Sequence, residues 1–127
     1  MPFYKTFTNI DWYYELEGEG EPLVFLHGWG VNSGIWRQQA KHFCRGYKVL
    51  VVDLPGHGQT QYHTITFEDM VYGLIDIMTF LDMVPATIVG SSLGGLVSFK
   101  VYDVCPEKVK ALVFVGSQPR FAKSEDY

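Results

Sequence analysis

A glycine-flanked turn in the second half of the chain places the tightest limit on its fold. The segment Gly90-Ser91-Ser92-Leu93-Gly94 follows the β-branched run 87–89 and leads into a helix-compatible run bounded by Pro106. This order predicts a strand, a sharp turn and a helix, with Ser92 at the centre of a G-x-S-x-G pattern. The turn needs its glycines because its central residue is strained, and side chains two positions before and after that residue would collide.

The predicted turn has a chemical consequence. It points the Ser92 hydroxyl outward above the strand ends, and it leaves the backbone N–H of Leu93, at the start of a helix, able to bind developing negative charge. A glycine-rich turn with an incidental serine is the alternative interpretation. The strand-to-helix context favours a nucleophilic serine.

Short apolar runs alternate with helical patterns along the rest of the chain. Buried strands are expected at 23–26, 47–52, 87–89 and 111–115. Residues 3–17 alternate aromatic and polar positions, which predicts an antiparallel hairpin. The expected fold class is α/β, with a mostly parallel sheet, helices on both faces and one domain over residues 1–127.

Two further helices are expected between these strands. Asn32 or Ser33 would cap the first, which stops at Gly46, and Thr66 with Asp69 forms a capping-box signature for the second. The first would bury Trp36, Ala40, Phe43 and Cys44, and the second Phe67, Met70, Val71, Leu74, Met78 and Leu81.

Composition excludes several function classes. The chain has 127 residues, of which 47% are hydrophobic, and its net charge of -4 is spread without charge runs, which argues against a nucleic-acid surface. No signal peptide is visible and the apolar runs are too short to span a bilayer, so a cytoplasmic location is expected. Cys44 and Cys105 lack a C-x-x-C partner, which predicts buried free thiols.

Chemistry in an open α/β sheet gathers at the carboxyl ends of the strands. Three loops are expected there: His27–Gly30 (HGWG), Asp53–Gly58 (DLPGHG) and the segment around Ser92 (GSSLGG). With these motifs in this order and after these strands, the whole chain resembles the α/β-hydrolase family.

The resemblance implies a role for each matching residue. Ser92 would be the nucleophile, the N–H groups of Leu93 and Trp29 the oxyanion hole, and the Trp29 indole part of the acyl pocket. Gly28 and Gly30 would keep the first loop close to the nucleophile, whose turn depends on Gly90 and Gly94. No metal or cofactor is implied.

A narrower resemblance concerns the substrate. Four segments look most like those of the biotin-pathway esterases that hydrolyse a pimeloyl acyl-carrier-protein methyl ester. They are LHGWGVNSGIW, VDLPGHG, SSLGGLVS and VGSQPRF. This resemblance implies a serine carboxylesterase that works through an acyl-enzyme. Its substrate would be a small acyl ester carried on acyl carrier protein.

Other polar residues have structural interpretations. His27 follows a buried strand and is expected to be a structural hydrogen-bonding residue, and Asp53 is expected to fix its Pro-Gly turn. His57 and His63 are expected to be solvent-exposed loop residues. Met70, Met78 and Met83 are expected in the core or at helix ends.

The chain lacks the remaining parts of a triad. The family order is Ser, then Asp or Glu, then His, whereas His27, His42, His57 and His63 all precede Ser92. The later acids are in or after the nucleophile's helix, or in the tail: Asp103, Glu107, Glu125 and Asp126. We therefore expect the N-terminal portion of a hydrolase, without its lid and C-terminal strands, that hydrolyses esters weakly or not at all by itself.

The expected truncation also has a structural effect. Residues 111–115 would form an uncovered apolar edge strand, which predicts self-association or pairing with a missing C-terminal half.

Two other functions compete with this interpretation. A dinucleotide-binding oxidoreductase is suggested by Gly28-x-Gly30 after a strand and by Asp53 at the end of the next, but the third glycine, Gly34, comes one residue late. A non-catalytic remnant or pseudo-hydrolase is suggested by the missing histidine. The intact nucleophile turn argues against that second alternative.

Overall fold

Six strands form one twisted sheet in the computed structural model, which describes residues 2–60 and 66–116. The sheet order is β1-β2-β4-β3-β5-β6. The strands are β1 (Phe3–Lys5), β2 (Asp11–Glu17), β3 (Glu21–Leu26), β4 (Tyr47–Val52), β5 (Ala86–Ser91) and β6 (Val109–Val115). The neighbouring strands β4, β3, β5 and β6 pair in parallel. Strands β1 and β2 form an antiparallel hairpin, and β2 also pairs antiparallel with β4. The predicted α/β fold with an N-terminal hairpin is confirmed.

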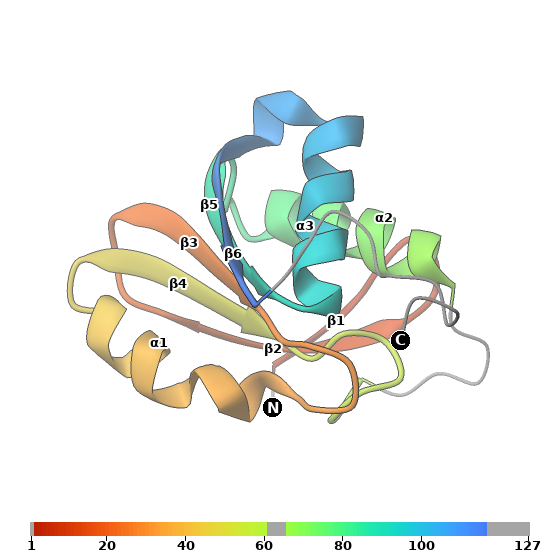
Figure 1. Cartoon of the computed structure of the whole chain (residues 1–127), viewed down its shortest axis with the longest axis horizontal. Coiled ribbons are helices and arrows are strands. Elements are labelled where there is room, and N and C mark those ends of the chain that lie inside the picture. Colours follow the sequence, from red (N-terminus) through yellow and green to blue (C-terminus); the bar gives the residue numbers. More distant parts are fainter. Residues whose placement is uncertain (1, 61–65, 117–127) are drawn as a thin grey trace.

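Helices cover both faces of this sheet, as parallel strands require. They are α1 (Arg37–Phe43), α2 (Phe67–Phe80) and α3 (Leu93–Val104), with short 3-10 turns η1 (Ser33–Trp36) and η2 (Pro106–Lys108). Figure 1 shows α2 and α3 together on one side of the sheet and α1 on the other.

Side-chain caps start the first two helical segments where the sequence places them. The Asn32 side chain accepts a hydrogen bond from the Gly34 N–H at 2.8 Å, and the Thr66 hydroxyl accepts one from the Asp69 N–H at 3.1 Å. Each bond satisfies one N–H that has no acceptor inside its own helix. The first segment differs from the expected helix in beginning as the 3-10 turn η1.

The core has two parts, one on each face of the sheet. The larger lies under α2 and α3 and includes Val24 and Leu26 of β3, and the smaller lies under α1 and includes Leu23 and Phe25 of the same strand. Because successive side chains of a strand point to opposite faces, a strand buried on both faces must be continuously apolar. This is the physical reason for the uninterrupted run at 23–26.

Some of the predicted burial is wrong. Phe43 and Phe67, expected in the buried helix faces, are exposed, and Ile77 is fully buried in α2 although it was not predicted there. Residues 111–115 form part of β6 and most of them are exposed, which differs from a fully buried strand but confirms the expected uncovered edge strand. This strand lies at the sheet edge, and its Val113 and Val115 line an open, mostly apolar cavity of about 530 Å³ beside α1.

Glycines allow α3 to approach β5 and β3 more closely than side chains would permit. A Cβ atom on Gly90 would lie 2.6 Å from the backbone of Gly94, and one on Gly94 would lie 2.5 Å from the carbonyl oxygen of Leu26. Neither contact can be relieved by a side-chain rotation, because both involve backbone atoms. The G-x-S-x-G pattern is therefore a packing requirement of this strand–helix junction.

We expect Gly94→Ala to lower the free energy of unfolding by about 1–3 kcal/mol, because the added methyl group overpacks a backbone contact. Urea denaturation followed by circular dichroism measures the change. Gly46→Ala is the matched control, since a Cβ there meets nothing within 4 Å. Equal unfolding midpoints for the two variants would contradict the packing argument.

Candidate active site

Three loops meet at the carboxyl ends of the neighbouring strands β4, β3 and β5. Ser92 follows β5 and directly precedes α3, and it adopts φ 53° and ψ -115°. A non-glycine residue in this region costs on the order of 1–3 kcal/mol and persists only when the surrounding structure imposes it. The half-buried Ser92 thus has the sharp, strained turn that its sequence context predicts.

The loop after β3 lies against this turn. A Cβ atom on Gly28 would come within 3.1 Å of the Ser92 Cβ atom and 3.8 Å of its Oγ. Trp29 and Gly30 come next, with Gly30 at φ 81°. The structure therefore brings Gly28, and with it the start of the loop that carries Trp29, beside the Ser92 side chain.

The start of α3 adds a polar feature next to Ser92. Leu93 is the first residue of the helix and is buried. The hydrogen bonds at this end of the helix begin at Ser92, whose carbonyl accepts from the N–H groups of Gly95 and Leu96 at 2.9 and 3.3 Å. The first N–H groups of a helix have no acceptor within it and lie at the positive end of its dipole. This end of α3 favours a negative charge that forms near Ser92.

His27 joins the loop after β3 to the loop after β4. Its ring is fully buried, its Nε2 accepts a hydrogen bond from the Leu54 N–H at 2.9 Å, and its Nδ1 lies 2.7 Å from the Gly28 carbonyl oxygen. Because Nε2 accepts, the proton resides on Nδ1, which donates to Gly28. Burial lowers the pKa of His27 below its ordinary value, so the ring stays neutral.

Asp53 holds the same two loops together through its carboxylate. One oxygen accepts from the Ser33 N–H at 2.7 Å and the other from the Gln59 N–H at 2.9 Å, and the residue is 2% exposed. The second bond closes the turn that the sequence assigns to Asp53. In the oxidoreductase alternative, Asp53 would bind the ribose of a dinucleotide. Its carboxylate is buried and already accepts two backbone hydrogen bonds, so it is not accessible to a ribose, which argues against that alternative.

His57 differs from its prediction as an exposed loop residue, because it is only 8% exposed. Its Nδ1 lies 3.1 Å from the Pro55 carbonyl oxygen, and its ring centroid lies 5.0 Å from the rings of both His27 and Trp29. A histidine between two glycines gives no local signal of such burial, because the contacts come from a distant loop. His63 lies outside the described residues.

A cavity of about 350 Å³ adjoins these loops. It is lined by Trp29, Gly30, Val31, Asn32, Gly56, His57 and Gly58. The Trp29 indole is 66% exposed, so its ring is available to an incoming molecule. The residues after β3 and β4 therefore form a concave surface at the strand ends, and Ser92 is not among the residues that line it.

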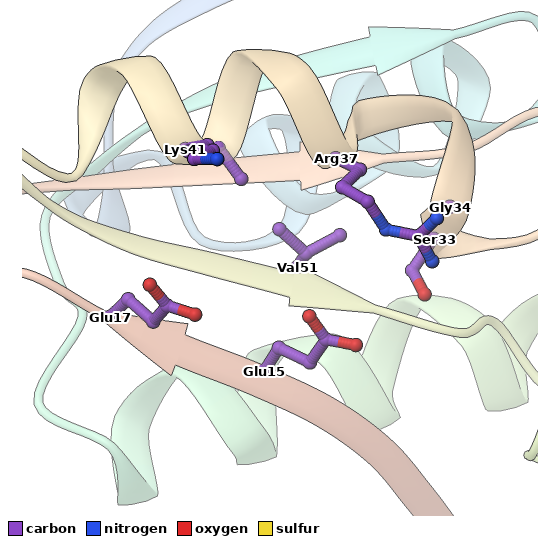
Figure 2. A pocket seen from close by; sticks show the side chains of 8 residues that line it. Glu15, Glu17, Ser33, Gly34, Arg37, Lys41 and Val51 are labelled. Carbon is purple, nitrogen blue, oxygen red and sulfur yellow. The ribbon is translucent and has the colours of Figure 1, made fainter.

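A second cavity of about 350 Å³ lies on the α1 side of the sheet. Figure 2 shows Glu15 and Glu17 on β2 and Arg37 and Lys41 on α1 around it. None of the predicted site residues lines this cavity, so it is separate from the strand ends that carry Ser92.

The remaining acids and cysteines are placed as follows. Asp103 is exposed on α3 and pairs with Lys100 at 3.1 Å, and Glu107 is exposed in η2. Cys44 and Cys105 are free thiols and only partly buried. Glu125 and Asp126 lie outside the described residues. Within residues 2–60 and 66–116, no group of three His, Cys, Asp or Glu side chains is arranged to hold a metal ion.

The buried neutral His27 predicts a pH-dependent stability. Below its ordinary pKa of 6.5, the unfolded chain binds a proton at residue 27 that the folded chain does not, so the free energy of unfolding falls with falling pH. The slope from this one group reaches at most about 1.4 kcal/mol per pH unit. Urea unfolding between pH 7.5 and 5.5 should show a flatter dependence for His27→Asn than for the wild type.

His42→Asn is the matched control for this measurement, because it removes an exposed imidazole on α1. The assignment to His27 fails if both variants keep the wild-type slope.

Relatives of known name match most of the chain. A protein from Photobacterium profundum named pimeloyl-[acyl-carrier protein] methyl ester esterase is 38% identical over 115 residues, which cover 91% of this chain and 43% of that protein. The protein of the same name from Vibrio cholerae is 38% identical over 113 residues, 87% of this chain and 42% of its own length. The chain thus spans less than half the length of these curated relatives.

Solved structures share the fold. A carboxylesterase structure from Nitrososphaera gargenis is 28% identical with a TM-score of 0.91, covering 98% of this chain and 48% of its own. The esterase EaEST from Exiguobacterium antarcticum is 25% identical with a TM-score of 0.89 and the same coverage of both chains.

No helix among the described residues has the length and apolar character needed to cross a membrane. The family model described as alpha/beta hydrolase fold matches residues 21–126. This match includes all three strand-end loops, and the chain belongs to the alpha/beta hydrolase fold family.

Proposed function

We propose that this chain carries the nucleophile and the oxyanion hole of a carboxylic-ester hydrolase. The observation that carries the proposal is the strained backbone of Ser92 at the start of α3, with Gly28 packed against its side chain. Strain of this kind is retained where it orients a reacting group. The names of the relatives and of the structural neighbours support the same class of reaction.

In this proposal Ser92 Oγ attacks the carbonyl carbon of an ester, and its proton passes to a general base. The carbonyl oxygen becomes an oxyanion, which the N–H groups of Leu93 and Trp29 stabilise by hydrogen bonds. The alcohol then leaves with a proton, and an acyl-enzyme on Ser92 remains. Water attacks this second ester, releases the carboxylic acid and restores the serine.

The general base is the part that these residues do not supply. All four histidines precede Ser92 in the sequence. His27 is committed to two hydrogen bonds with backbone atoms, His42 lies on α1, away from the strand ends, and His57 Nδ1 is bound to the Pro55 carbonyl. His63 lies outside the described residues. We therefore propose that polypeptide outside these 127 residues provides the base and its acid partner.

A catalytically incomplete portion or pseudo-hydrolase is the second candidate function. The observation that favours it is the short span of the match, which covers 43% of the Photobacterium profundum relative. The two candidates differ in whether Ser92 becomes active when the remaining residues are supplied.

The names of the relatives also suggest a substrate. They are called methyl ester esterases of pimeloyl-[acyl-carrier protein]. We propose an acyl methyl ester presented on acyl carrier protein, with the exposed Trp29 ring and its adjoining cavity beside the acyl chain.

The test is a complementation assay with a short-chain p-nitrophenyl ester. The chain is assayed by itself and after production together with the portion of the Photobacterium profundum relative that the match leaves uncovered. By itself it should show only the residual rate of an oxyanion hole without a base, about 10³–10⁴-fold over water. The complemented chain should be faster, and Ser92→Ala should lose that gain.

Ser98→Ala is the control for this assay, because Ser98 is a buried serine of α3 whose hydroxyl donates to the Gly95 carbonyl. Robust turnover by the chain alone that Ser92→Ala abolishes would contradict the missing base. Complemented turnover that survives Ser92→Ala would contradict the nucleophile.

The uncovered edge of the sheet predicts association of the isolated chain. Val113 and Val115 are 44% and 45% exposed and line the 530 Å³ cavity beside α1. An apolar edge strand pairs readily with another chain, so light scattering should detect oligomers of the chain alone and fewer of them in the complemented sample. A monodisperse monomer of the isolated chain would contradict this expectation.

A further inference from the structure

The neighbours of Trp29 place little steric restriction on the direction of its N–H, because both are glycines. Trp29 stands between Gly28 and Gly30 in a turn, and Gly30 has φ 81°. Glycine restricts the backbone less than any other residue. Contacts of the Trp29 side chain must therefore contribute to fixing the peptide group on which the proposed oxyanion hole depends.

Among the described residues, the Trp29 ring packs against the ring of His57. The two ring centroids lie 5.0 Å apart at an interplanar angle of 77°, an edge-to-face arrangement. Trp29 is 66% exposed whereas His57 is 8% exposed. The tryptophan is thus the exposed partner of this pair, and the histidine is the buried one.

His57 is held from several directions. Its Nδ1–H donates to the Pro55 carbonyl at 3.1 Å, and its backbone N–H donates to the Leu54 carbonyl at 2.9 Å. Its carbonyl accepts from the N–H of the fully buried Thr60 at 3.0 Å. On its other side, its ring packs against His27 at 5.0 Å between centroids. These contacts fix the His57 ring relative to β3 and β4.

We propose that His57 is a positioning residue for the oxyanion hole, acting through the Trp29 ring to hold the Trp29 N–H toward the reacting carbonyl. This inference rests on the proposed function, because it assigns His57 to the same reaction. His57 itself neither attacks the substrate nor accepts the serine proton. Its effect is on the geometry of one hydrogen-bond donor.

Trp29 fluorescence tests this contact on the chain itself. Trp12 and Trp36 are 0% and 8% exposed, so iodide, which does not enter a protein core, quenches mainly the emission of Trp29. Trp29→Phe should remove the quenchable emission and so verify the assignment. In His57→Ala we expect a larger iodide quenching constant and a lower fluorescence anisotropy of this emission.

Two variants separate positioning from general loss of structure. His57→Phe keeps an aromatic ring beside Trp29 and should restore the quenching constant and the anisotropy toward the wild type. His42→Ala is the matched control, since it removes an imidazole that packs edge-to-face on Phe43 at 5.0 Å on α1. It should leave the Trp29 emission unchanged.

The kinetic measurement uses the complemented ester hydrolysis. His57→Ala should lower kcat by about tenfold to a hundredfold, because a small misplacement of a donor weakens the transition state, and it should leave KM nearly unchanged. His57→Phe should recover most of kcat. If His57 acted only by stabilising its own loop through the hydrogen bond to Pro55, phenylalanine would not restore kcat, because it cannot form that bond.

The outcomes separate the two proposals. If His57→Ala leaves quenching and anisotropy at wild-type values, the positioning role is overturned whatever the kinetics. It is also overturned if the fluorescence changes but kcat does not. If complemented hydrolysis is independent of Ser92, the proposed function fails, and with it the positioning role of His57 in that reaction. The fluorescence response then reports a structural contact alone.

Discussion

The close approach of α3 to β5 and β3 is the constraint on which the rest of the site depends. It is possible because Gly90 and Gly94 present only hydrogen atoms where other residues would place Cβ atoms within 2.6 Å of backbone. The same junction imposes the positive φ of Ser92. One packing contact thereby fixes the serine, starts the helix behind it and sets its distance from Gly28.

A second set of contacts organises the loops in front of the serine. His27 and Asp53 use buried polar atoms to join the loop after β3 to the loop after β4, and each binds backbone groups of the other loop. Buried polar atoms are costly unless they are paired. The pairing explains why these two residues, which have the chemistry of a base and an acid, serve the architecture of the site.

Much of this architecture was predictable from local signals. The alternation of apolar runs with helical patterns, the caps at Asn32 and Thr66, and the turn around Ser92 depend on neighbours within a few residues. Burial was harder to predict. Phe43 and Phe67 match a helical apolar face but are exposed. The spacing of apolar residues predicts which side chains share one face of a helix, but it does not predict how much of that face other elements cover.

Local sequence signals are enough to predict the order of strands and helices, the strained turn at Ser92 and the three loops that meet at the strand ends. Each depends on local chain stereochemistry and on the rule that parallel strands end at one edge. By contrast, the burial of His57 between His27 and Trp29 and the exposure of Phe43 and Phe67 can be seen only in the folded structure. Those features depend on contacts between residues far apart in the chain, and no local pattern encodes them.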